Sequence, residues 1–433
     1  MNATLQTTEQ EPARRRVWPV GIRALRHRNY RLFFAGQLIS VLGTWMQSVA
    51  QAWLVYRLTG SALLLGLVGF ADKIPIFVLG LAGGVVADRF DRHRVVITTQ
   101  TLSMLQALAL WILVASGHAS VELIFILATV SGIINAFDLP GRQSFIASMV
   151  AQDDLPNALA LNSSVFNAAR ILGPAIAGIV VAGIGEGPCF LLNAVSYVAV
   201  IGCLAMMRFE KRPGRAEVAS TFQYLARGLL FVWTTPPVRA LLVLLGLVSI
   251  LGMPYVVLMP IFAGDIFRAG ARGLGTLMGC MGIGAFAGAA TLARRGSVKG
   301  LGRVVAAASI GFGVALIAFA SSTSFVLACL VLVVAGYAMI TQAAATNLLI
   351  QSFCPDDLRG RVMSIYTIML VGMAPFGSLM AGAFAHTVGA RITVATGGLL
   401  CAVSGGVFAS GIPGMRRFVQ YRIPDSKVGP DAR

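Results

Sequence analysis

Twelve apolar runs, each long enough to cross a lipid bilayer, constrain this chain more than any other feature. A spanning helix needs about 20 predominantly apolar residues. The runs begin near Leu32, Leu64, Val95, Val121, Ser164, Pro188, Arg239, Leu274, Val304, Phe325, Val362 and Ile392. Backbone groups in lipid must satisfy their own hydrogen bonds, so only helices and closed barrels span a membrane. Only 12% of the residues are charged, against about 25% in soluble domains, so the sequence predicts an all-α membrane protein with twelve transmembrane helices.

The positions of the basic residues predict how these spans are oriented. With the first span starting inside, the predicted inner segments carry 28 of the 34 Lys and Arg residues, and the outer segments carry four. Because basic residues mark the cytoplasmic side, we expect both termini in the cytoplasm of a cell with a bacterial-type inner membrane. The net charge of +17 then indicates topology and contact with anionic lipids, not nucleic-acid binding.

A polar segment divides the chain into two halves of six spans each. Residues 208–238 carry charges and Pro-rich turns, and their apolar residues recur at helical spacing, which predicts an amphipathic helix on the inner membrane surface. Similar Asp-Asp-Leu loops precede the fifth and eleventh spans. We therefore expect a cytoplasmic N-terminal segment, a six-helix bundle, a linker, a second bundle and a cytoplasmic tail at residues 1–31, 32–207, 208–238, 239–412 and 413–433.

Charged residues inside the apolar runs are candidates for function, because they are costly in lipid. Asp72 and Lys73 lie in the second span, and Arg170 lies in the fifth. Burial favours the protonated form of a carboxylate, so Asp72 is the candidate for proton coupling. Alternatively, Asp72 lies near the outer end of its helix and pairs with Lys73, since it is about 24 Å from Asp88 along a helix. Arg170 would contact Asp138 or an anionic substrate.

Gly173, Pro174 and Gly178 in the fifth span predict close helix packing. Proline removes a backbone donor and bends a helix, and glycine lets a neighbouring helix approach. That neighbour is expected to be the eighth span, which carries Gly275, Gly279, Gly284 and Gly288. Ordinary packing of membrane helices would by itself explain these glycines.

Four segments resemble the major facilitator superfamily, and within it the branch of enterobactin-exporter-like and drug–proton antiporter proteins. They are residues 51–61, 84–94, 137–142 and 167–174, and the likeness extends over about residues 29–413. Asp91 stands where the broad superfamily has Gly, and an acidic residue there is typical of this branch. The resemblance implies twelve helices in two pseudo-symmetric six-helix bundles, with transport by alternating access.

The resemblance also implies roles for the charged loop after the second span. Asp88, Arg92 and Asp138 resemble a charge relay that locks the cytoplasmic gate, since a carboxylate–guanidinium–carboxylate chain can hold helix ends together. Arg89, Asp91 and Arg142 belong to the same cluster. Alternatively, these charges serve topology alone. The same resemblance assigns helix packing and an antiporter motif to Gly84, Gly173, Pro174 and Gly178.

Polar residues on the spans that line the cavity in this fold are candidates for substrate contact. They are Gln47, Gln51, Asn135, Arg170, Tyr337 and Gln342, with Trp45, Thr341 and Asn347 on nearby surfaces. Each could equally be an interhelical hydrogen-bonding residue, which is common for Gln and Thr in membranes. A cavity with few polar groups favours a bulky amphipathic substrate over a sugar.

We therefore expect a functional monomer that exports small amphipathic molecules, drug- or siderophore-like, by proton antiport. No phosphate-binding loop of the Gly-x-x-x-x-Gly-Lys type occurs in the sequence, which disfavours an ATP-driven pump. We expect no metal and no cofactor. The alternatives are a facilitator or importer of a metabolite, and a membrane-embedded enzyme or sensor, which would need a catalytic cluster that the sequence does not display.

Overall fold

The computed structural model describes residues 19–207, 221–295 and 297–422, and within them twelve helices are long and apolar enough to cross a membrane. Eleven of the twelve spans begin within four residues of the predicted starts. The fifth span was predicted wrongly: it begins at Gln152, not near Ser164. Its first turns carry Asn157, Asn162 and Ser163, and these polar residues hide the helix from a search for apolar runs.

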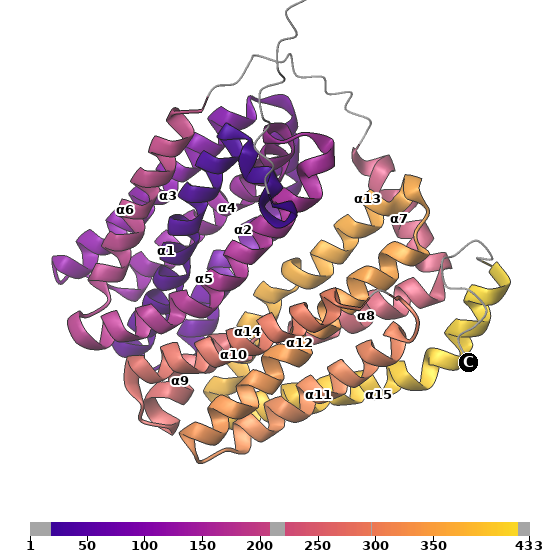
Figure 1. Ribbon diagram of the computed structural model, residues 1–433. Coiled ribbons are helices and arrows are strands. Elements are labelled where there is room, and N and C mark those ends of the chain that lie inside the picture. The colour runs from indigo at the N-terminus through magenta and orange to yellow at the C-terminus, as the bar shows by residue number, and fades with distance from the viewer. Residues whose placement is uncertain (1–18, 208–220, 296, 423–433) are drawn as a thin grey trace, which may run out of the picture.

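The first six spans form the N-terminal bundle, which is indigo to magenta in Figure 1. A short 3-10 helix, η1 (Val20–Arg26), precedes them, and η2 (Gln152–Asp154) leads into the fifth. The spans are α1 (Arg28–Thr59), α2 (Ala62–Arg89), α3 (Arg92–Ala115), α4 (Val121–Met149), α5 (Leu155–Ile184) and α6 (Gly187–Ala205).

The last six spans form the C-terminal bundle, which is orange to yellow in Figure 1. A further helix, α7 (Thr221–Thr234), precedes them. The seventh span is made of α8 (Pro236–Leu251), α9 (Tyr255–Ile261) and the π-helical turn η3 (Phe262–Ile266). The remaining elements are α10 (Gly270–Ala293), α11 (Leu301–Ser321), α12 (Phe325–Phe353), α13 (Asp356–Thr367), the π-helical η4 (Ile368–Gly372), α14 (Ala374–Val388) and α15 (Ala390–Arg422).

Local sequence explains where several helices begin and end. The Ser61, Ser120 and Ser324 hydroxyls accept from backbone N–H groups in the first turns of α2, α4 and α12. Such side chains satisfy donors that the helix leaves unpaired. Gly60 ends α1 in the left-handed region, with φ of 59°, where a residue without a Cβ is favoured.

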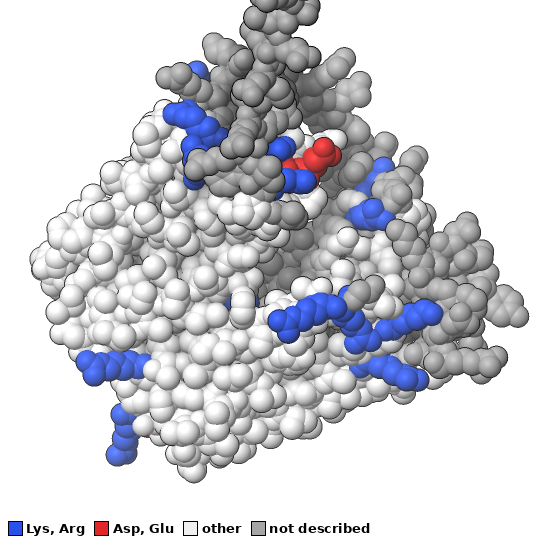
Figure 2. Space-filling model, viewed as in Figure 1, with Lys and Arg blue, Asp and Glu red and all other residues white. Residues whose placement is uncertain are grey.

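The outer surface of the bundles suits lipid. Large apolar side chains are exposed on it, including Ile126, Ile179 and Val407. Figure 2 shows the sides of both bundles as largely uncharged, with Lys and Arg gathered mainly toward the upper and right-hand ends of the view. A continuous apolar exterior flanked by charged ends is the surface expected of helices that span a bilayer.

The two bundles converge at one end and diverge at the other. They come together toward the lower left of Figure 1 and separate toward the top, where α6 ends and α7 begins. A Cβ added at Gly66 of α2 would lie 2.8 Å from the Cα of Gly382 on α14, and one at Gly178 of α5 would lie 3.0 Å from the Cα of Gly275 on α10. These backbone contacts lie close to the loops at the converged end.

Candidate gating and substrate-binding residues

The Asp138 carboxylate is the centre of a buried polar network. Its side chain is on α4 and pairs with Arg142 of the same helix at 2.6 Å (Oδ2 to Nε). Its other oxygen accepts from the Thr99 hydroxyl at 2.7 Å and from the Gln100 amide at 2.9 Å, both on α3. Arg142 also donates to the Gln37 amide oxygen of α1 at 3.1 Å. The network therefore ties three helices of the N-terminal bundle together, and all five of its side chains belong to that bundle.

The loop between α2 and α3 is arranged differently from the relay that the sequence predicts. The Asp88 side chain lies outside the part that the structure describes. Asp91 caps α3, because its carboxylate accepts from the backbone N–H groups of His93 and Arg94 at 2.9 and 3.3 Å. Arg92 donates to the Ser144 carbonyl oxygen at 3.4 Å, while Arg89 is exposed at the end of α2. In this conformation the ion-pair partner of Asp138 is Arg142, and the relay stays a prediction.

The close approach of α2 to α4 is made by Gly83, not by Gly84. A Cβ at Gly83 would collide with the Ala136 carbonyl oxygen, whereas one at Gly84 would meet no atom within 4 Å. The packing role that the resemblance assigns to Gly84 therefore belongs to Gly83 in this structure. The two residues are adjacent in sequence, and only the rotation of α2 decides which of them faces α4.

Asp72 lies deeper than the outer end of its helix. It is ten residues after Ala62, about 15 Å along α2 at 1.5 Å per residue. Its carboxylate pairs with the Lys73 ammonium at 2.6 Å, and the Asp72 side chain is 27% exposed. Gly132 of α4 packs closely against Pro75 one turn further along. Asp72 is thus an accessible carboxylate within the N-terminal bundle, with a basic partner beside it.

The α5 glycines make the contact predicted for them, but only half of α10 takes part. Gly178 packs against Gly275, and the nearest atoms to a Cβ at Gly279 belong to Ile171 and Ala175 of α5. Gly284 and Gly288 pack instead against α12 within their own bundle. Gly173 packs against Trp45 of α1, and α5 continues through Pro174 as one helix. The Gly-Pro segment therefore lies where α5 contacts both α1 and the opposite bundle.

Three of the cavity candidates in the N-terminal bundle divide into two kinds. Gln47 is buried: it donates to the Gln106 amide oxygen at 2.9 Å and accepts from the Asn193 amide at 2.7 Å. It joins α1, α3 and α6, which is the interhelical role and not a cavity position. Gln51 and Asn135 are half-buried, so they remain candidates for substrate contact.

The candidates on α12 divide in the same way. Tyr337 is 39% exposed, and its hydroxyl lies 3.2 Å from that of Thr291. Gln342 is only 1% exposed, and its side-chain nitrogen has no hydrogen-bond partner among the described residues. Tyr337 is therefore accessible to a substrate in this conformation, while Gln342 is enclosed within its bundle.

Two polar contacts near the converged end were not predicted from the sequence. Tyr56 at the end of α1 donates to the Asp265 carboxylate of η3 at 2.5 Å, which joins the two bundles. Arg57 forms a two-point pair with the nearly buried Glu186, at 2.7 Å from Nε and 3.2 Å from Nη2. Tyr56 and Arg57 both lie within residues 51–61, one of the segments that carry the family resemblance. That resemblance is the one sequence signal that marks these two residues.

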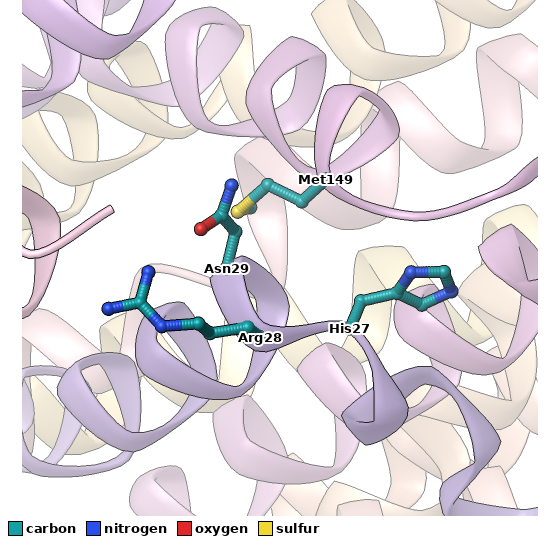
Figure 3. Close-up of a pocket in the computed structure, with 4 residues that line it drawn as sticks. All are labelled: His27, Arg28, Asn29 and Met149. Carbon is teal, nitrogen blue, oxygen red and sulfur yellow. The ribbon is translucent and has the colours of Figure 1, made fainter. Parts of the chain in front are cut away.

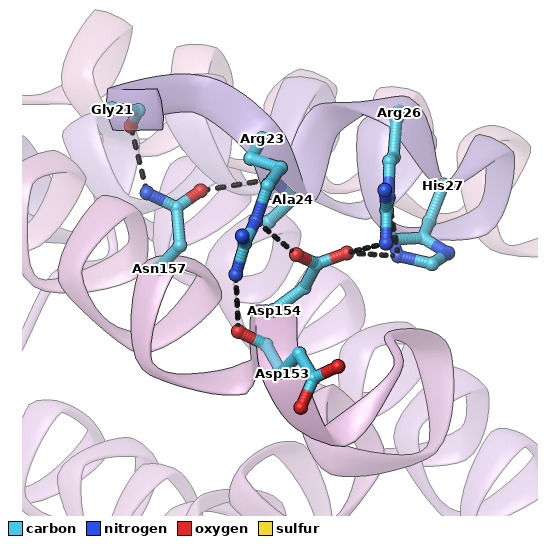
Figure 4. Close-up of polar contacts among 8 residues, drawn as sticks. All are labelled: Gly21, Arg23, Ala24, Arg26, His27, Asp153, Asp154 and Asn157. Atoms are coloured by element: carbon cyan, nitrogen blue, oxygen red, sulfur yellow. Dashed lines mark hydrogen bonds and ion pairs between the residues drawn. The ribbon is translucent and has the colours of Figure 1, made fainter. Parts of the chain in front are cut away.

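A second cluster that the sequence did not predict surrounds Asp154, at the start of α5. The Asp154 carboxylate is fully buried and forms ion pairs with Arg23, with Arg26 at 2.7 Å and with His27 at 2.7 Å. Figure 4 shows these side chains converging from η1 and from His27, which directly follows it, and Asn157 bonding to the backbone of η1. Asp154 therefore fastens the chain before α1 to the start of α5.

The same region contains an open pocket of about 490 Å³. Figure 3 shows its lining, which is His27, Arg28 and Asn29 from the start of α1 and Met149 from the end of α4. It lies at the end of the N-terminal bundle opposite the glycine contacts. It is therefore separate from the interface at which the two bundles meet.

The sequence model of the transmembrane secretion effector family matches residues 21–416, which includes every membrane span. The chain belongs to this family. This family match and the twelve spans agree with the resemblance to the major facilitator superfamily that the four sequence segments carry.

Three relatives of this transmembrane secretion effector family member are transporters. The staphyloferrin A transporter of Staphylococcus aureus is 28% identical over 83% of this chain and 90% of its own length. The multidrug efflux pump Tap of Mycolicibacterium fortuitum is 27% identical, with 84% and 90% covered. The enterobactin exporter EntS of Shigella boydii is 22% identical, with 84% and 87% covered.

A solved structure of similar fold supports the architecture. A mutant form of the peptide transporter POT has a TM-score of 0.71, with 12% identity over 90% of this chain and 95% of the other. The family match and the three relatives, rather than this likeness of fold, identify the chain as a multi-pass membrane transporter and not an enzyme. Within the described ranges, no group of three or more His, Cys, Asp or Glu residues could hold a metal ion.

Proposed function

We propose that this protein exports small amphipathic molecules, drug- or siderophore-like, across the bacterial inner membrane by proton antiport and alternating access. The proposal includes a monomer with both termini in the cytoplasm, bundles at residues 32–207 and 239–412, and a linker at 208–238 between them. The relatives described above carry siderophores or drugs by their names, and two of them are an exporter and an efflux pump.

The observation that carries the proposal is the uneven distribution of contacts between the bundles. The cross-bundle contacts at Gly66, Gly178 and Tyr56 lie toward the loops that we assign to the outer face. At the opposite end, the Asp138 network bonds within the N-terminal bundle. One closed end and one separated end is the arrangement expected of a single state in an alternating-access cycle, in this case open to the inside.

Asp72 is the first candidate for proton coupling and Asp138 the second. Both are carboxylates within predicted spans, and each has a basic partner at 2.6 Å. A carboxylate that binds a proton releases such a partner, which gives a way to couple protonation to helix movement. Asp72 has the more exposed side chain, 27% against 4%, and so it is more open to protons in this conformation.

The test is proton flux in proteoliposomes under an imposed pH gradient, screened with siderophores, macrolides and cationic dyes. We expect a substrate to collapse the gradient, and we expect Asp72→Asn to abolish that collapse. Asp153→Asn, at an exposed carboxylate in η2 at the start of the fifth span, is the matched control. Collapse that survives Asp72→Asn but not Asp138→Asn would move the coupling site to Asp138. Substrate flux without proton movement would contradict antiport and leave a facilitator.

A further inference from the structure

Arg170 lies at the centre of the transporter, not near its inner end. It is the sixteenth residue of the 30-residue helix α5, so each end of the helix is about 22 Å away along the axis. A Cβ at Gly282 of α10 would lie 3.1 Å from the Arg170 carbonyl oxygen. Arg170 therefore lies where the N-terminal bundle faces the C-terminal one.

Among the described residues, no carboxylate balances the charge of Arg170. Asp72 is paired with Lys73, and Asp138 is paired with Arg142. The Arg170 Nη2 donates to the neutral Asn167 side chain at 2.8 Å, and the buried Nε has no hydrogen-bond partner in the part of the chain that the structure describes. A guanidinium has five N–H donors, and the only acceptor that the described residues supply to them is the Asn167 side chain.

The surroundings of Arg170 fit a water-filled cavity better than lipid. Ser163, Phe166, Asn167 and Arg170 follow one another at helical spacing and share one face of α5. Ser163 and Phe166 are exposed, and the Phe166 ring meets Trp45 of α1 edge-on at 5.8 Å. Ionisable residues within spans face cavities or other helices, and substrate sites in such transporters lie near the bilayer midplane between the repeats.

We propose that Arg170 binds an anionic oxygen group of the substrate, so that the transported molecules are carboxylate-type anions or zwitterions with an aromatic or apolar part. This inference rests on the export function proposed above and narrows its substrate class. A guanidinium without a counter-charge in a partly buried site attracts carboxylates in two-point geometry and repels cations. Trp45 and Phe166 supply an adjoining aromatic surface for the rest of the molecule.

The test compares two dyes that share a xanthene ring system but differ in charge: fluorescein, an anion, and rhodamine 6G, a cation. Binding to the purified full chain is measured by fluorescence anisotropy. We expect the native protein to favour fluorescein. We expect Arg170→Gln to weaken fluorescein binding by about 10- to 100-fold, as for loss of one charge-assisted hydrogen-bonded contact, and to leave rhodamine 6G binding unchanged or stronger.

Two further variants separate charge from folding. Arg170→Lys keeps the charge and should retain part of the fluorescein affinity, and Arg272→Gln, at an exposed arginine of α10, should change neither dye. Preference of the native protein for rhodamine 6G would overturn the proposal. An equal loss of both dyes in Arg170→Gln would also overturn it, because it would assign the residue to helix packing alone.

Transport in everted membrane vesicles distinguishes this inference from the export function. Uptake of rhodamine 6G but not fluorescein, driven by a pH gradient, would preserve export and overturn the anion site. Arg170-dependent binding of fluorescein, with movement only in the inward direction of the cell, would preserve the anion site and contradict export.

Discussion

The glycine contact between α5 and α10 allows a conformational prediction with a magnitude. A Cβ at Gly178 would lie 2.8 Å from the Ala271 carbonyl oxygen, short of the 3.4 Å at which ordinary contact begins. The helices would have to separate by about 0.6 Å for alanine and by more for valine, and overpacking of this kind costs about 1–3 kcal/mol. If only the conformation with a closed outer end carries that cost, Gly178→Val shifts the equilibrium toward the outward-open state by about 5- to 150-fold.

Spin labels at the inner ends of the two bundles measure this shift. Gln143 near the end of α4 and Arg294 at the end of α10 are both exposed, and pulsed dipolar spectroscopy gives the distance between labels placed there, after replacement of the six native cysteines. We expect the distance to shorten in Gly178→Val, as the inner ends close. Gly183→Val is the matched control, since a Cβ at Gly183 meets no atom within 4 Å. Identical distance distributions for the two variants would refute the assignment of this contact to one state.

Three further predictions concern polar contacts. Tyr56→Phe removes the hydrogen bond to Asp265, worth about 0.5–1.5 kcal/mol, and should shift the same spin-label distance in the same direction as Gly178→Val, though less; no shift would mean that the contact forms in both states. Glu186→Gln weakens the pair with Arg57 by about 1 kcal/mol and should lower the Tm by about 2 °C. The spin-label distance should not change, and a changed distance would contradict a purely stabilising role. Asp154→Asn should free η1 and speed tryptic cleavage after Arg23, whereas unchanged cleavage would show that this segment is held by other contacts.

The spans could be predicted from the sequence because membrane insertion depends on a local property, the length of an apolar run. The fifth span shows the limit of that reasoning. Its inner turns carry Asn162, Ser163 and Asn167, and Asn167 lies one turn before Ile171, which contacts α10 of the other bundle. Polar residues in the first turns shorten the apolar run, so the sequence places the start of this span near Ser164 and not at Gln152. That later start also places Arg170 closer to the inner surface than it is.

The partners of the polar residues could not be predicted, because they depend on how each helix is rotated. Gln47 and Gln51 are one turn apart and should share a face, yet Gln47 is enclosed by Gln106 and Asn193 while Gln51 is half-exposed. Sequence spacing therefore identified residue types suited to a polar site, but not which of them bond to each other.

The kinds of contact at the two ends of the molecule explain how such a protein can change state at low cost. At the converged end, Gly66, Gly178, Gly275 and Gly382 meet through van der Waals contact alone, so separating them breaks no hydrogen bond. Apart from the Tyr56–Asp265 hydrogen bond, the charged contacts described above, such as that of Asp138 with Arg142, lie within one bundle and can move with it as a rigid body. Arg170 lies between the bundles without a counter-charge among the described residues. A substrate bound there can therefore affect the equilibrium between the two states. A bound anion supplies the missing counter-charge in the state that encloses it. It stabilises that state only to the extent that it contacts Arg170 more closely there than in the other state.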